Sequence, residues 1–150
     1  MTREKFFSSE DEFQKWLFFQ SDVLESFIKE FDNLDLDYSP ESLIQLEQWI
    51  LERHYSPKSF IKDEKAEIID AMIRYVGQIY VKHLKWIWDI ELKDQKYAFY
   101  SMPLVKPKDD KDNIYAESPF SLLVACTDRR VGDYIYRMFM NMKQEMKKRG

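Results

Sequence analysis

Apolar residues recur every three or four positions along most of this chain, which is the spacing of one face of an α-helix. The first such run predicts a helix over residues 10–31. It follows a capping box of Ser9 and Glu12, whose hydroxyl and carboxylate can each accept a hydrogen bond from a free amide at the helix start. Ser21 and Asp22 can cap a second segment, so we expect the helix to bend or break near them.

Two more helices are predicted between residues 39 and 84. One starts at Ser39-Pro40-Glu41, which supplies a cap, a proline suited to the first turn and a favourable negative charge, and it ends before Pro57. The other covers residues 63–84 and is apolar over most of its circumference, so it should lie centrally with neighbours on several sides. Gly77 inside it costs about 1 kcal/mol relative to alanine. Close approach of another backbone would explain this glycine.

A strictly alternating pattern follows, and it predicts a half-buried strand over residues 86–92. Residues 93–96 can turn the chain into a second strand over 97–105, which Pro103 restricts to an edge or an early end because proline has no N–H. Residues 114–116 can add a third short strand. The apolar side of the first strand carries Trp86, Trp88, Ile90 and Leu92.

The last third of the chain returns to helical patterns after a charged stretch. Residues 106–113 alternate charge and are predicted to form a solvated loop. Ser118-Pro119 repeats the cap-and-proline signal and opens a helix over about residues 120–126. The run 128–132 breaks that helix, and a final amphipathic helix covers about residues 135–146.

Composition favours one domain of this class, spanning residues 1–150. A chain of 150 residues with 45% hydrophobic residues normally builds a single core. Its 3 glycines and 5 prolines are too few for the many turns of an all-β fold. The patterns together predict a helix-rich α+β domain, with N-terminal and C-terminal helices flanking a small antiparallel sheet at about residues 86–116.

A cytoplasmic location is the expectation from the termini and the cysteine content. The first ten residues mix charges with two phenylalanines and lack the apolar core of a secretion signal. No run approaches the roughly 20 apolar residues of a membrane span. The single cysteine, Cys126, cannot form an internal disulfide and is expected to be buried and inert.

Charge is unevenly distributed along the chain. Residues 1–50 contain 4 Lys or Arg against 12 Asp or Glu, a net charge of −8, whereas residues 51–150 carry +4. An acidic N-terminal third can attract basic partners and disfavours nucleic acid there, although solubility alone also explains it. The basic stretch 143–149 is what the dipole favours at a helix C-terminus, and it does not indicate nucleic-acid binding.

The sequence predicts no metal site, no cofactor and no catalytic residue. The two histidines, His54 and His83, lie on different predicted helices without closely spaced ligand partners. The three glycines are isolated and cannot form a phosphate-binding loop. No serine has the flanking glycines of a nucleophile turn, and no nucleophile has a base beside it in sequence.

Two clusters allow a functional and a structural interpretation. Arg129 and Arg130 could hold a carboxylate or phosphate by bidentate hydrogen bonds, but they could equally pair with surface acids while Asp128 caps a helix. Trp86 and Trp88 could form a ligand platform, yet their alternation is explained more simply as the core face of a strand. We favour the structural interpretation in both cases.

Several short motifs also resemble those of a known group: Leu46 with Trp49-Ile50, Arg74-Tyr75-Val76-Gly77, Trp86 with Trp88, Ser118-Pro119, and Asp128-Arg129-Arg130 with Gly132. Through these motifs, over about residues 38–138, the chain resembles small uncharacterised cytosolic proteins of Bacillus-type bacteria. Some of these are similar to immunity proteins that neutralise toxins. The resemblance implies a protein-binding role and transfers no catalytic residue.

The leading hypothesis is therefore a non-enzymatic protein that binds a protein partner, in concrete form an immunity-type protein that neutralises a basic toxin through an acidic surface. The expected contacts surround an exposed connection and are Asp32, Asp35, Asp37 and Glu41. The alternative is a small enzyme or ligand-binding protein with a pocket near the sheet. That pocket would use Arg129, Arg130 and His83.

Overall fold

Helices dominate the computed structural model, which describes residues 6–149. The N-terminal residues on which the expected absence of a secretion signal rests lie partly outside this range. Within the described range the elements in chain order are α1 (Glu10–Phe18), α2 (Gln20–Glu30), the 3₁₀ turn η1 (Asp32–Leu34), α3 (Ser42–Arg53), α4 (Pro57–Asp63), α5 (Ala66–Leu84), β1 (Ile87–Asp89), β2 (Leu104–Lys106), α6 (Pro119–Arg129) and α7 (Tyr134–Arg149). The predicted helix-rich α+β class is confirmed.

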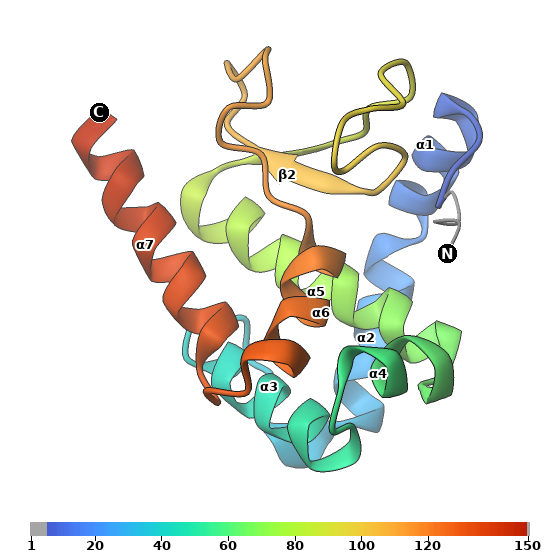
Figure 1. The fold of residues 1–150 in the computed structure, drawn as a ribbon, viewed down its shortest axis with the longest axis vertical. Helices are drawn as coiled ribbons and strands as arrows, with labels where there is room; N and C mark the ends of the chain where they lie inside the picture. Colours follow the sequence, from blue (N-terminus) through green and yellow to red (C-terminus); the bar gives the residue numbers. More distant parts are fainter. Residues whose placement is uncertain (1–5, 150) are drawn as a thin grey trace.

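Helix α5 runs through the centre of the molecule, as its nearly all-apolar circumference predicts. It contacts α2, α6, α7 and both strands, and Figure 1 shows α6 crossing in front of it, α7 along one side and the sheet above. Tyr75, Val76 and Ile79 on α5 have no exposed surface. Burial of such side chains contributes about 1.5–3 kcal/mol each, so α5 organises the hydrophobic core.

The first predicted helix breaks at Phe19, two residues before Ser21, and gives α1 and α2. Ser9 caps α1 by accepting from the N–H of Glu12, as predicted, while the Glu12 carboxylate accepts from the N–H of Ser8. The break is stabilised from α5, because Arg74 donates to the carbonyl oxygen of Trp16 at 2.7 Å. That carbonyl would bond the amide four residues on in an unbroken helix.

Two helix starts agree with the cap-and-proline signal, and a third instance was missed. Ser39 accepts from the N–H of Ser42 at the start of α3, and Ser118 accepts from the N–H of Ser121 in α6. The same Ser-Pro pair occurs at residues 56–57 and opens the unpredicted helix α4. The prediction ended one helix before Pro57 and began the next at residue 63, so it left no room for this short helix.

The sheet is smaller than predicted. Strands β1 and β2 pair antiparallel in the register Ile87↔Lys106, Trp88↔Val105 and Asp89↔Leu104. Most of the predicted second strand is wrong, because Ser101 adopts a left-handed φ of 62° and donates its N–H to the carbonyl of Glu91. The predicted third strand over residues 114–116 is wrong, because these residues form no strand, and a single antiparallel bridge joins Val105 to the next residue, Glu117.

The tryptophans of the first strand face the core, which confirms the structural interpretation of that pair. Trp86 is 3% exposed, and its ring lies 5.3 Å from that of Tyr80. The ring of Trp88 occupies the place where a β-carbon at position 77 would sit. Gly77 is therefore required by an aromatic side chain, and the prediction of a close backbone was wrong.

The charged stretch 106–113 is not fully solvated, because two of its charged side chains are buried. Lys106 lies in β2 and pairs with Asp89 at 2.7 Å. Asp110 accepts from the N–H groups of Ile114 and Tyr115 at 2.8 and 2.7 Å. These charged groups are satisfied internally, so they hold the loop against the sheet.

The C-terminal helices are longer than their patterns indicated, and a buried acid fixes the start of α7. Glu47 has no exposed surface and accepts from the N–H groups of Tyr134 and Ile135 at 3.1 and 2.9 Å. Burial raises the pKa of Glu47, partly offset by these hydrogen bonds. Among the described residues, no helix is both long and apolar enough to cross a bilayer.

Candidate functional site

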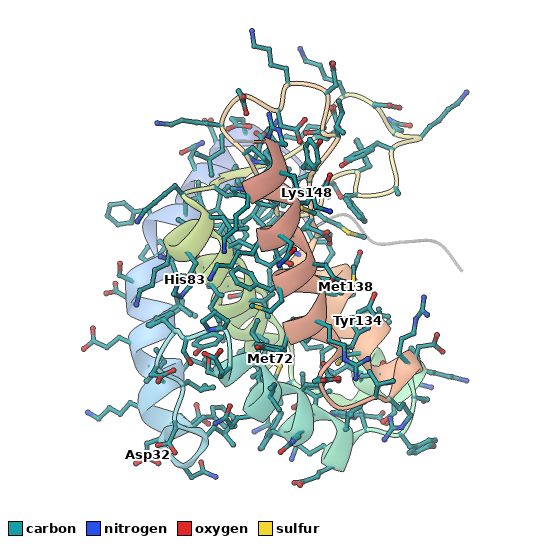
Figure 2. The ribbon with its side chains drawn as sticks, turned by 90° about the vertical axis from the view of Figure 1, so that its left-hand side faces the viewer. Asp32, Met72, His83, Tyr134, Met138 and Lys148 are labelled. Atoms are coloured by element: carbon teal, nitrogen blue, oxygen red, sulfur yellow. The ribbon has the colours of Figure 1, made fainter. Side chains whose placement is uncertain are left out.

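The four predicted contact acids lie on one exposed connection between α2 and α3, residues 32–41, which we call the acidic connection. The side chains of Asp32, Asp35, Asp37 and Glu41 are all exposed. Figure 2 shows Asp32 at the edge of the molecule, away from the helical core. The structure therefore places these acids where a partner can reach them.

The acidic connection is held by the core beneath it. Leu36 is 5% exposed, and the ring of Tyr38 stacks on that of Tyr75 with centroids 5.1 Å apart. The Tyr75 hydroxyl accepts from the N–H of Tyr38 at 3.0 Å and is hydrogen-bonded to Ser42. His83 donates through Nε2 to the carbonyl of Tyr38 at 2.7 Å. The exposed acids thus sit on a fixed backbone.

Two residues of the acidic connection adopt a left-handed backbone. Asp35 has φ 52° and Tyr38 has φ 64°. Aspartate tolerates this region, but a bulky tyrosine is found there only where its surroundings hold it. Two hydrogen bonds from Ser39 lower the pKa of Asp37, so its carboxylate stays charged well below neutral pH. The connection combines a defined shape with stable negative charge.

The residues of the alternative pocket, Arg129, Arg130 and His83, are not brought together. Arg130 donates to the carbonyls of Leu51 and His54 at the C-terminal end of α3. His83 bonds Tyr38, which precedes the N-terminal end of the same helix. The 12 residues of α3 separate these points by about 18 Å.

Both arginines have local roles that differ from pairing with surface acids. Arg130 satisfies carbonyls that the end of α3 leaves free, a structural role that the sequence did not indicate. The Arg129 guanidinium lies 5.8 Å from the ring centroid of Tyr134. Figure 2 shows Tyr134 and His83 far apart in the molecule.

A buried polar relay that the sequence did not predict lies where α3, α4 and α5 meet. His54 is bonded through Nδ1 to the Ser59 hydroxyl at 2.9 Å and through Nε2 to the Glu64 carboxylate at 2.8 Å. Arg53 donates two hydrogen bonds to the same carboxylate at 2.9 and 3.2 Å. Since a carboxylate only accepts, Nε2 carries a proton and donates it to Glu64, and the Ser59 hydroxyl is bonded to Nδ1 on the other side of the ring. The fold thus brings together a nucleophile, the Ser59 hydroxyl, and a base, the His54 ring, which the sequence did not predict.

The relay has the connectivity of a catalytic triad, but its surroundings indicate a structural clamp. Ser59 is 9% exposed and His54 4% exposed. Burial alone would raise the pKa of Glu64, and hydrogen bonds from Arg53, His54 and the N–H of Lys65 outweigh it, so the pKa of Glu64 is lowered. A fully bonded, buried cluster of this kind fixes the three helices relative to one another. The relay was missed because α4, which carries Ser59, was missed.

A groove of about 550 Å³ lies between α2 and α5. Tyr38 is one of its lining residues, so the groove borders the acidic connection. None of the relay residues and none of Arg129, Arg130 and His83 line it. Across residues 6–149, no group of three His, Cys, Asp or Glu residues is close enough to hold a metal ion. The groove is lined by Gln20, Ser21, Leu24, Glu25, Ile28, Lys29, Tyr38, Gln78 and Lys82.

Comparison of the chain with protein-family models, curated proteins and solved structures finds no match.

Glu117 gives the fold a specific pH dependence. Burial beside Val105 raises the pKa of its carboxyl to about 7. Between pH 4.5, the ordinary value, and pH 7 the unfolded chain has lost this proton while the folded chain keeps it, so stability falls as pH rises. The variant Glu117→Gln lacks this titrating group. The difference in free energy of unfolding, variant minus unchanged protein, should therefore increase by about 2 kcal/mol between pH 5 and pH 8. Urea unfolding at both pH values measures this, and an unchanged difference would contradict it.

Proposed function

We propose that this chain is a non-enzymatic binding protein whose acidic connection docks a basic protein partner. The observation that carries the proposal is the placement of four exposed carboxylates on a backbone fixed by the Tyr38–Tyr75 stack and its hydrogen bonds. A surface that is already ordered loses little conformational entropy when it binds. Its charge favours partners that present lysine and arginine.

An immunity-type role is the concrete form that we propose, with cytoplasmic neutralisation of a basic toxin. The net charge of −8 over residues 1–50 supports it, because a strong field of one sign accelerates the encounter with a partner of the other sign. Tight and fast capture is what neutralisation of a toxin requires. The resemblance to immunity proteins motivates this form.

Reversal of the four acids is the direct test. In a variant that combines Asp32→Lys, Asp35→Lys, Asp37→Lys and Glu41→Lys, we expect the partner captured from native cytosol to bind about a hundredfold more weakly, since like charges then face each other. Surface plasmon resonance at two salt concentrations measures the affinity and its salt dependence.

The control variant makes the same change in net charge elsewhere on the surface. It combines lysine substitutions of Glu52, Asp63, Glu67 and Asp112, all of which are exposed. The control should keep most of the affinity. Equal binding by the unchanged protein and the acidic-connection variant would refute the proposed function.

A further inference from the structure

The groove between α2 and α5 has an apolar floor with opposite charges at its rim. Leu24 is buried, and Ile28 and Tyr38 are half-buried beside it. On α2 the lining extends from Gln20 to Lys29, about 13 Å of helix. Its volume of about 550 Å³ is within the range of clefts that bind ligands. The groove can therefore receive two turns of a partner segment.

The two lysines of the groove lie near groups that attract a positive charge. Glu25 and Lys29 are four residues apart on α2, a spacing at which opposite charges attract. The Lys82 ammonium lies 5.6 Å from the ring centroid of Tyr38, and its charge helps to lower the pKa of Asp37 after the hydrogen bonds of Ser39. Lys82 offsets only one of the four negative charges of the acidic connection, so the net charge beside Tyr38 is negative.

The walls of the groove select a helix over an extended segment. Both walls are helices, whose backbone N–H and C=O groups are bonded within α2 and α5. An added strand would find no backbone partners here, whereas a helix satisfies its own backbone and offers only side chains.

From these observations we infer that the groove and the acidic connection form one continuous docking surface for an amphipathic helix of the partner. Its apolar stripe lies on Leu24, Ile28 and Tyr38, and its basic end lies on the acidic connection. This inference rests on the proposed function and specifies the partner chemistry. It predicts apolar residues at helical spacing next to a cluster of lysine or arginine.

A peptide selection on the full chain tests the inference. The library displays 18-residue peptides with apolar residues at helical spacing and random residues elsewhere, and clones that also bind Ser21→Trp are removed. Ser21 lines the groove and is exposed, so tryptophan there fills the groove without removing a core contact. Ser26→Trp is the matched control, because Ser26 is exposed on the same helix outside the groove lining.

The selected peptides should carry Lys or Arg at one end and lose about tenfold or more in affinity for Ser21→Trp, while Ser26→Trp stays within about twofold. Gln78→Trp, on the opposite wall, should reproduce the loss and guards against misfolding of the first variant. Selection of acidic peptides, or no peptide that distinguishes Ser21→Trp from Ser26→Trp, would overturn the inference.

The native partner separates this inference from the proposed function. If the partner binds Ser21→Trp normally but fails to bind the four-lysine variant of the acidic connection, the proposed function stands and the groove is not part of the interface. If both variants bind it normally, the proposed function is wrong and the inference falls with it.

Discussion

Gly77→Ala should lower the free energy of unfolding by about 3 kcal/mol, although alanine is the better helix former by about 1 kcal/mol. The added β-carbon would clash with three ring carbons of Trp88. Trp88 cannot retreat easily, because its ring lies 5.1 Å from that of Trp16 on the neighbouring helix. Urea unfolding followed by circular dichroism measures the loss.

Two further variants separate the steric clash from the general effects of replacing glycine. Gly132 has φ 92° but no atom within 4 Å of a β-carbon, so Gly132→Ala should cost only about 1–2 kcal/mol of backbone strain. Trp88→Leu removes the ring, and combining it with Gly77→Ala should cost less than the sum of the two single changes. Full additivity in this cycle would show that position 77 is not limited by Trp88.

Glu64→Ala should lower the free energy of unfolding by about 2–3 kcal/mol, because it leaves the buried Nε2–H group of His54 without an acceptor. The change leaves His54 and Arg53 without the acceptor that joins them. Because its pKa is lowered from the ordinary value of 4.5, the Glu64 carboxylate stabilises the protein at neutral pH and loses this effect as pH falls through its folded-state pKa. The deficit of the variant should therefore shrink in acid.

The neighbouring exposed acid supplies the control for this measurement. Glu52→Ala, in the last turn of α3, should change stability by at most about 0.5 kcal/mol. Thermal unfolding at pH 7 and pH 3.5 gives both quantities for both variants. A loss at Glu64 no larger than that at Glu52 would contradict the role of the relay as a clamp.

Local signals explain which elements could be predicted and which could not. Ser39 and Ser118 act within a few residues of the helices that they start, so their patterns were sufficient. Helix α4 carries the same signal at residues 56–57, but its seven residues give too few turns for an apolar period to stand out. The prediction of a second strand over residues 97–105 was mostly wrong, although its apolar run is long enough to stand out. Such a run is also compatible with turns, and the left-handed backbone of Ser101 makes turns of it here.

In the candidate site, too, local features could be predicted and features that depend on packing could not. The four acids of the acidic connection could be chosen from sequence, because charge and a short gap between helices are local properties. The groove beside them depends on how α2 and α5 pack, and its two walls lie about fifty residues apart in the chain. Arg130 shows the same limit, because the carbonyls that it caps belong to α3.

The sequence by itself determined the helix-rich class, the central position of α5, the core-facing tryptophans and the exposed acids. Each of these follows from apolar spacing, capping or charge within a few residues. Only the tertiary structure decided that Gly77 makes room for Trp88, that Ser59, His54 and Glu64 meet, and that a groove adjoins the acidic connection. These features arise between elements. The local sequence is compatible with many such contacts, and close packing of the side chains in three dimensions decides which of them form.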